Sequence, residues 1–148
     1  MKFLYDRRPG ATSIIEIVLV MSVVMFLIGI IVPRVLGFMA QLKEDKTRLM
    51  MANVNTAIAM YTNDMGHPPA PEEGGLKALI IRPKGTTGND WRGSYLPGEK
   101  NIPQDGWKNN FIYNAPPRKF KGIYKKYELY SAGKDEDDDA SDRLRVGE

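Results

Sequence analysis

Acidic side chains gather in one segment near the C-terminus of this chain. Eight residues, 135 to 142, carry six carboxylates: Asp135, Glu136, Asp137, Asp138, Asp139 and Asp142. These charges repel one another unless solvent or a cation relieves them, and Ca²⁺ takes six to eight oxygen ligands of this kind. An EF-hand loop begins similarly, but its sixth and twelfth positions fall here on Ala140 and Val146 instead of glycine and glutamate. The segment is therefore either a calcium site of another type or a solvated acidic tail.

One further carboxylate, Glu16, stands at the head of an apolar run. Residues 14 to 32 are otherwise apolar except for Ser22 and Gly29. A carboxylate inside a membrane costs about 2.5 to 3.5 kcal/mol on insertion scales, so it needs a partner. No cation follows within the next turns, which favours a partner from outside the helix. The alternative is that Glu16 lies at the membrane interface, where the helix dipole favours a negative charge at the N-terminus.

Other reactive side chains are scarce, which argues against an enzyme. The chain has no cysteine, so thiol chemistry and disulfides are excluded, and its single histidine, His67, lies between glycine and proline in an expected turn. No glycine-rich phosphate loop or nucleophilic serine motif is present. The net charge is +3, but the basic residues are scattered and no nucleic acid is expected as a partner. One basic group keeps DNA uptake as a minor alternative: Lys119, Lys121, Lys125 and Lys126.

The apolar run predicts a membrane-spanning helix. Basic residues precede it and none lies inside it, so the N-terminus should remain cytoplasmic. A helix of 16 to 19 residues is roughly 24 to 29 Å long, just enough to cross a bilayer. A secretory signal peptide would end in small residues, yet Phe38 stands three positions before a cut after Ala40. Cleavage there is not expected.

The helical periodicity continues beyond the apolar run and predicts one helix from about Thr12 to Met65. Gly66 and Pro68 end it, and Pro33 should kink or locally unwind it by removing one backbone hydrogen bond. In the second half, a stripe with three-to-four spacing should face a core. The stripe comprises Val35, Phe38, Met39, Leu42, Leu49, Val54, Ile58, Tyr61 and Met65.

The remainder predicts a small α+β domain. We expect a short helix over Glu72–Ile80, then a long loop over Pro83–Gly106. Two strands follow, Phe111–Tyr113 and Tyr127–Tyr130, rich in strand-forming residues and separated by a turn at Pro116-Pro117. They should form a small antiparallel sheet against the helix. Trp91 and Trp107 are interpreted as core or subunit-contact side chains.

The N-terminal pattern resembles the signature of type IV pilins and pseudopilins. It comprises the basic leader, Gly10 to Glu16, the apolar run and Pro33, which stands 17 residues after Glu16. The resemblance implies that a prepilin peptidase cuts on the cytoplasmic side and methylates the new N-terminus. Glu16 becomes the fifth residue if the cut lies between Ala11 and Thr12; a cut after Gly10 is the alternative. The family usually has glycine immediately before the cut and phenylalanine after it, and this chain departs from both.

The C-terminal half resembles the major pseudopilins of type II secretion. Met60 to Pro68 and Gly75–Leu79 are similar to the family's helix end and following short helix. Pro103–Asn110 is similar to its Pro-x-Asp-Pro-Trp-Gly-Asn motif, with Gly106 and Lys108 as departures. Ser131 to Asp135 is similar to its Ser-Ala-Gly-x-Asp sequence before an acidic loop. The resemblance covers nearly the whole chain.

The resemblance implies a pilin-like fold in four parts. These are a leader (1–11), a transmembrane assembly half of the helix (12–33), its amphipathic half (34–66), and a small α/β periplasmic domain with an acidic loop (67–148). It also implies that the loop binds structural calcium in place of a disulfide, with Asp135, Asp139 and Asp142 as candidate ligands. Asp135 matches the first ligand position, whereas the family's adjacent aspartate pair falls on 142–143 without a gap or on 138–139 with one.

The implied function is that of a structural subunit. Through its N-terminal helix the chain would polymerise into a short periplasmic filament that drives type II secretion, with Glu16 pairing with a neighbouring subunit. Implied partners are other copies, minor pseudopilins, the prepilin peptidase, the inner-membrane assembly platform with its ATPase, and exported proteins. Two alternatives stay open: a type IV pilus or competence pseudopilin, and a membrane-anchored calcium-binding domain that never polymerises.

Overall fold

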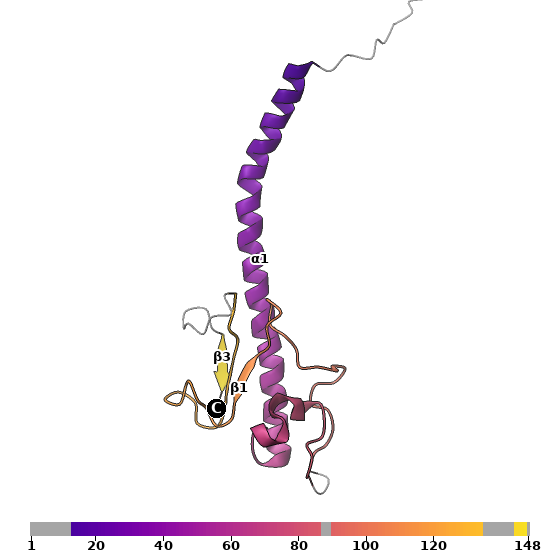
Figure 1. Cartoon of the computed structure of the whole chain (residues 1–148), viewed down its shortest axis with the longest axis vertical. Helices are drawn as coiled ribbons and strands as arrows, with labels where there is room; N and C mark the ends of the chain where they lie inside the picture. Colours follow the sequence, from indigo (N-terminus) through magenta and orange to yellow (C-terminus); the bar gives the residue numbers. More distant parts are fainter. Residues whose placement is uncertain (1–12, 87–89, 135–143, 148) are drawn as a thin grey trace, which may run out of the picture. The chain divides into compact units, whose positions relative to one another are not determined.

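The computed structural model describes residues 13–86, 90–134 and 144–147. The chain divides into two compact units, residues 1–39 and 40–148. Its elements are the α-helix α1 (Ile14–Met65), the 3₁₀ helices η1 (Pro71–Glu73) and η2 (Gly75–Leu79), and the strands β1 (Ile112–Asn114), β2 (Glu128–Tyr130) and β3 (Arg145–Gly147) (Figure 1). A long N-terminal helix with a small antiparallel sheet confirms the predicted fold class.

In the first unit, the described residues belong almost entirely to α1. Every side chain from Ser13 to Met39 is exposed. Between Glu16 and Arg34 the segment is apolar around its whole circumference except for Ser22, which is the pattern of a helix that lies in lipid or among other helices. The described residues of the first unit therefore have no buried core.

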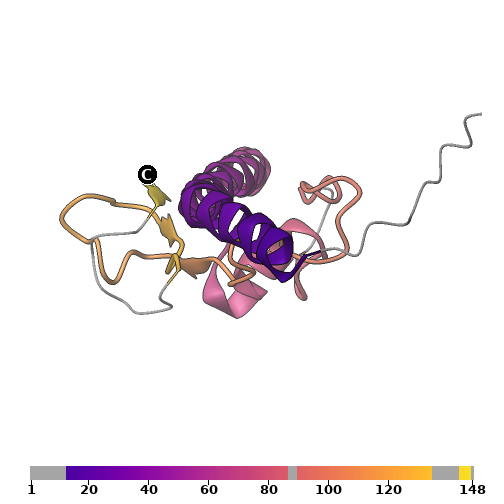
Figure 2. The same cartoon turned by 90° about the horizontal axis from the view of Figure 1, so that it is seen from above.

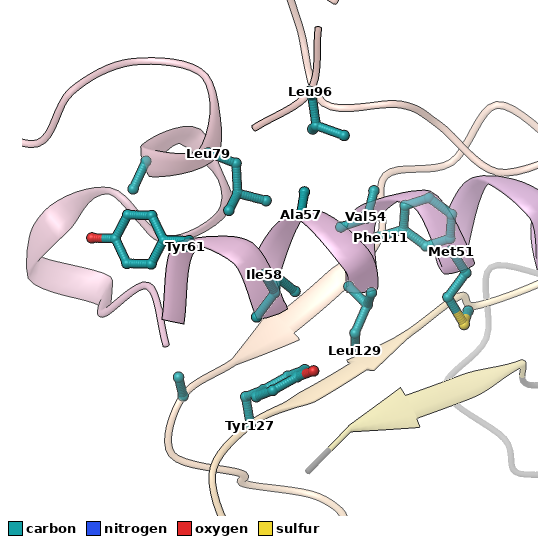
Figure 3. Packing of buried hydrophobic residues seen from close by; sticks show 12 residues of the cluster. Met51, Val54, Ala57, Ile58, Tyr61, Leu79, Leu96, Phe111, Tyr127 and Leu129 are labelled. Atoms are coloured by element: carbon teal, nitrogen blue, oxygen red, sulfur yellow. The ribbon is translucent and has the colours of Figure 1, made fainter. Parts of the chain in front are cut away.

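The second unit has a core built on one face of α1. Val54, Ile58 and Tyr61, spaced three to four residues apart, are fully buried. Figure 3 shows Leu79 and Leu96 on one side of this face and Tyr127 and Leu129 on the other. The rest of the buried apolar cluster comprises Met51, Ala57, Ala78, Phe111 and Ala115. Met65 ends the helix, as predicted, because Gly66 adopts a left-handed conformation with φ 81°.

The sheet has the order β1-β2-β3, and both neighbouring pairs are antiparallel. The central strand β2 is buried throughout, and its Leu129 stands opposite Tyr113 on β1 and Val146 on β3. In Figure 2 the strands lie on one side of the second unit and residues 90–100 on the other. The edge strand β3 was not predicted, because three residues with one basic side chain carry almost no strand pattern.

Two sequence-based expectations need correction. The predicted apolar stripe is confirmed at Val54, Ile58 and Tyr61, which are buried. It is wrong at its N-terminal members, which are exposed: Val35, Phe38, Met39, Leu42 and Leu49. Thr47 and Met51 are buried in their place, because the loop that contains Gly106 covers Thr47. The predicted helix over Glu72–Ile80 is instead two 3₁₀ helices, since Gly74 between them has φ 95°. The two expected strands are confirmed, each one residue later in its start.

Candidate assembly site

Glu16 lies in the first turn of α1, where backbone N–H groups have no helical partner. The N–H groups of Glu16 and Ile17 both donate to the carbonyl oxygen of Ser13, at 2.9 and 3.2 Å. The carboxylate is therefore next to the positive end of the helix dipole. Among the residues that the structure describes, none forms an ion pair with Glu16. The pairing of Glu16 with a neighbouring subunit stays a prediction.

The helix that follows is long and apolar enough to cross a membrane. Its most apolar 18-residue window has a mean hydropathy of 3.0, and none of that window is buried. The polar group of Ser22 is satisfied locally, because its Oγ donates to the carbonyl oxygen of Val18 at 2.7 Å. The other side chains on this surface are apolar, so lipid or other apolar helices are the chemically suitable surroundings.

Pro33 lies inside α1, and the backbone is helical on both sides of it. Because proline has no N–H, the carbonyl of Gly29 lacks its usual helical donor. Gly29 has open space where a side chain would stand. The helix is not unwound at Pro33, and the kink stays a prediction.

In the second unit, a buried aspartate organises the loop that resembles the family motif. Asp105 is fully buried. Its Oδ1 accepts hydrogen bonds from the N–H groups of Trp107 and Asn109, at 2.9 and 2.7 Å. Its Oδ2 accepts one from Ser131 Oγ, at 2.7 Å. Both carboxylate oxygens are therefore occupied, and the loop is fastened to the residues that follow β2.

The same loop is fastened to α1 through Gly106, one of the two residues that depart from the family motif. The N–H of Gly106 donates to Thr47 Oγ1 at 2.9 Å, and Thr47 Oγ1 donates to the carbonyl of Lys43 at 2.8 Å. A Cβ on Gly106 would collide with the Lys43 backbone. Lys108 has φ 72°, a left-handed conformation that glycine adopts more easily. The loop therefore keeps a glycine-like backbone at 108 without a glycine.

A second buried carboxylate, Glu128 on β2, holds the loop of residues 118–126, named here the basic loop. Its Oε1 accepts from the N–H groups of Arg118 and Lys119 and from Asn114 Nδ2, and its Oε2 accepts from Phe120 N–H at 2.7 Å. Burial raises the pKa of the Glu128 carboxyl, but these hydrogen bonds outweigh burial and leave the pKa below its usual value of 4.5. Glu128 is therefore a charged anchor and not a free acid.

Sequence reasoning missed these anchors, although signals for them exist. Thr47, Asp105 and Glu128 are polar residues with no exposed surface. Asp105 and Ser131 belong to the two segments that resemble family motifs, so their contact was open to inference. Trp91 confirms the expectation of a core aromatic, because it packs against the core and its Nε1 donates to the Ala78 carbonyl at 2.9 Å.

Several predicted site residues lie outside the described residues. These are the processing residues Gly10, Ala11 and Thr12 and the candidate calcium ligands Asp135, Asp139 and Asp142. Among the residues that are described, no group of three or more acidic or histidine side chains is placed to hold a metal ion. The cleavage site and the calcium site therefore stay predictions.

Comparisons with known proteins agree on one family. Residues 34–146 match the family model described as type II secretion system (T2SS), protein G. The type II secretion system core protein G of Pseudomonas aeruginosa is 30% identical over 138 residues, covering 92% of this chain and 91% of that protein. The protein of the same name from Aeromonas hydrophila is 28% identical, covering 87% of this chain and 85% of that protein.

A solved structure has the same fold. It is the crystal structure of the major pseudopilin from the type 2 secretion system of enterohaemorrhagic Escherichia coli, with a TM-score of 0.55 and 21% sequence identity. The match covers 78% of this chain and 96% of that one. With the family model spanning most of the sequence, the conclusion is that this chain belongs to the protein G family of type II secretion systems, the major pseudopilins.

Proposed function

We propose that this chain is a structural subunit that polymerises through α1 into a short periplasmic filament driving type II protein secretion. The observation that carries the proposal is the contrast within one helix. Residues 14–39 are wholly exposed and, apart from Glu16, Ser22 and Arg34, carry no polar side chains, while the domain that follows completes its core without them. An apolar rod of this kind needs either lipid or other copies of itself. Membership of the protein G family supports copies as the final partner.

The chain would be processed before it assembles. A prepilin peptidase would cut between Ala11 and Thr12 and methylate Thr12, which makes Glu16 the fifth residue. The alternative cut after Gly10 makes Glu16 the sixth. N-terminal sequencing and the intact mass of the mature protein distinguish the two, because the products differ by one alanine.

Glu16 would provide the register between subunits. The new N-terminal amine is a cation near pKa 8. Paired with the Glu16 carboxylate of a neighbour, it relieves a charge that is costly in an apolar bundle. A subunit that joins out of register would leave both charges unpaired. The pair therefore selects one position along the growing filament.

The other proposed partners follow from the position of the chain in the membrane. The chain would be anchored in the bacterial inner membrane with its N-terminus cytoplasmic and its domain periplasmic. The assembly platform with its ATPase and the minor pseudopilins would build and start the filament, which would push exported proteins. The subunit's role would then be mechanical and not catalytic, which membership of the protein G family supports.

The test is assembly of the full chain in membranes, measured as a ladder of crosslinked oligomers. The matched variant is Glu16→Gln, which keeps the side-chain size and removes the charge. We expect the wild type to give a long ladder, and the variant to insert equally well but to give about ten-fold fewer oligomers beyond the dimer. A wild-type chain that remains monomeric at high expression would refute the proposal and favour a non-polymerising membrane-anchored domain.

We also propose that the acidic segment holds a structural Ca²⁺ through Asp135, Asp139 and Asp142. The residues that flank this segment are joined, because Ser131 N–H, after β2, donates to the carbonyl of Leu144, before β3, at 3.0 Å. Bound calcium would stabilise that closure, in a chain that has no cysteine for a disulfide. The test is thermal melting during calcium titration, with magnesium as the control. An unchanged melting temperature at millimolar calcium would refute the site.

A further inference from the structure

We propose that an open groove beside η2, in the second unit, is a docking site for an acidic peptide segment of another protein, one that carries apolar side chains between its carboxylates. Such a site goes beyond the proposed function, because it needs neither the N-terminal half of α1 nor polymerisation. The chemistry of the occupant follows from three properties of the groove: its size, its half-buried apolar residues and its exposed cations.

The groove is larger than a typical small-molecule pocket. Its volume is about 1630 Å³, whereas pockets for small ligands measure roughly 300–1,000 Å³. Four segments surround it: α1 near Lys46, the stretch from η1 to Ile81, the loop of residues 98–105, and the residues from Lys108 into β1. A space of this size suits a segment of polypeptide better than a metabolite.

The half-buried residues of the groove, named here its floor, are apolar and packed on the core. Leu76, Ile80 and Ile102 line the groove, and each also packs against the buried cluster. Ile81 lines it as well and is 66% exposed. Because core packing restricts the floor side chains, a partner can cover them with little loss of conformational entropy. The floor therefore favours a partner that brings apolar side chains of its own.

The charged side chains on the exposed rim of the groove are mostly cations. They are one carboxylate, Glu99, and four lysines: Lys46, Lys77, Lys100 and Lys108. In the part of the chain that the structure describes, no ion pair joins any of these lysines to a carboxylate. The other acid in the lining, Asp105, is fully buried and has both oxygens hydrogen-bonded within the domain. Among the described residues the rim thus has an excess of positive charge, which an acidic partner would match.

A second hollow in the same domain shows the opposite arrangement. It lies between Met60 on α1 and the residues around Arg92. Its two charged residues match each other, since Arg92 Nε lies 3.8 Å from Asp64 Oδ1. Tyr95 Oη also donates to Asp64 Oδ2, at 3.0 Å. The groove beside η2 differs from this hollow in that the described residues give its lysines no such match.

The backbone that carries the rim is held by hydrogen bonds on two sides of the groove. On one side, the N–H of Ile81 donates to the carbonyl of Lys77 at 2.9 Å. On another, the N–H of Lys108 donates to the carbonyl of Asp105 at 3.2 Å. A rim with an ordered backbone keeps its cations apart at set positions. A partner must therefore match the groove in the placement of its carboxylates as well as in their sign.

The test is the binding of short fluorescent peptides to the full chain in a neutral detergent, measured by fluorescence anisotropy. The main probe is a short peptide in which glutamate alternates with valine. Two control peptides change one property each: lysine replaces glutamate in the first, and serine replaces valine in the second. We expect the glutamate–valine peptide to bind about ten-fold more tightly than either control, and its affinity to fall as salt is raised.

Charge reversal on the rim locates the site. Lys77→Glu with Lys100→Glu should weaken binding of the glutamate–valine peptide about ten-fold, because two attractive contacts become repulsive. The matched control is Lys121→Glu with Lys125→Glu, which changes the net charge equally on exposed residues of the basic loop, outside the groove. This control should bind the peptide about as tightly as the wild type.

The apolar contribution is tested at Ile81. Ile81→Ser should weaken binding of the glutamate–valine peptide about five-fold, because the valines lose an apolar contact. Ile123→Ser is the matched control, since Ile123 is 58% exposed and does not line the groove. Both side chains are largely exposed, so neither change should lower the melting temperature. Thermal melting of the two variants thus separates a loss of binding from a loss of fold.

Equal binding of the three peptides, or equal binding by the groove variants and their controls, would overturn the proposal. A wild-type chain that binds none of the peptides would also overturn it. In that case, a shorter oligomer ladder after reversal at positions 77 and 100 would assign the groove to a second copy. Loss of binding to phosphatidylglycerol vesicles in the same variant would assign it to lipid. A wild-type chain that forms no ladder but binds the glutamate–valine peptide would refute the proposed function and support this site.

Discussion

Residues 14–39 and residues 47–61 are parts of the same helix, yet their apolar side chains differ in burial. In the first region every side chain is exposed, including Ile28 at 52%. In the second, one face is covered by the sheet and the η2 segment, and Ile58 is fully buried. Both regions are thus helical. They differ in whether the surface that covers their apolar side chains belongs to the same chain.

This difference teaches how one chain can fold alone and still require copies of itself. The second region brings its partner in the same polypeptide, so its core forms in each monomer. The first region leaves its partner to lipid and then to neighbouring subunits, which makes assembly a continuation of burial. The boundary lies near Lys43 and Thr47, where the loop after Asp105 first contacts the helix.

The difference between the two regions can be tested by shortening one isoleucine side chain in each. Ile58→Ala should lower the free energy of unfolding by roughly 2–5 kcal/mol, because it leaves a cavity in a packed core. Ile28→Ala should leave the unfolding of the domain unchanged and reduce only oligomer formation. Thermal or denaturant unfolding of the full chain in detergent measures the first effect, and the crosslinked ladder measures the second. Equal loss of stability in both variants would contradict the comparison.

The second largest effect on the free energy of unfolding is expected at Glu128, which anchors the basic loop. Glu128→Gln should cost about 2 kcal/mol at neutral pH, because hydrogen bonds to a charged acceptor are replaced by weaker ones and one amide group faces N–H donors. The pKa of Glu128 is lowered in the folded state, so its contribution is complete above the unfolded value of 4.5 and is lost as pH falls through the folded value.

The difference in stability between wild type and Glu128→Gln should therefore be constant at neutral pH and shrink below about pH 4.5. Denaturant unfolding at a series of pH values measures it. Other carboxylates titrate in both proteins and cancel in the difference. A gap that widens on acidification would mean that Glu128 is not a charged acceptor in the fold.

The boundary between the two regions can be tested at Gly106. Gly106→Ala places a Cβ against the backbone of Lys43, and overpacking of this kind costs about 1–3 kcal/mol. Gly122→Ala is the matched control, since that glycine has open space and no positive φ. Chemical denaturation compares the two. If Gly106→Ala were as stable as the control, the loop would not be pressed against α1 as described.

The smallest expected effect is a gain. Lys108→Gly should raise stability by about 0.5–1 kcal/mol, because glycine adopts the left-handed conformation at this position without steric cost. Lys108→Ala removes the charge without relieving the backbone and separates the two causes. Thermal melting under identical conditions compares the three proteins. A gain in the alanine variant would assign the effect to charge.

Much of helix α1 was predictable because its determinants are local. The length of the apolar run, the position of Glu16 and the end of α1 at Met65 all follow from residue types close together in the chain. The strands β1 and β2 were also found, since Tyr and Leu favour strands over short segments. These features depend on periodicity and composition, which a sequence displays directly.

The sequence alone thus determined a membrane-compatible helix with one acid at its head, followed by a small α+β domain. Only the tertiary structure decided which face of α1 the domain covers, because Thr47 is buried through Gly106, a residue 59 positions away. It also decided that Asp105 bonds to Ser131 and that Glu128 holds the basic loop in shape. The physical reason is that a buried polar group needs specific partners, and those partners are brought together by the fold and not by the spacing of residues.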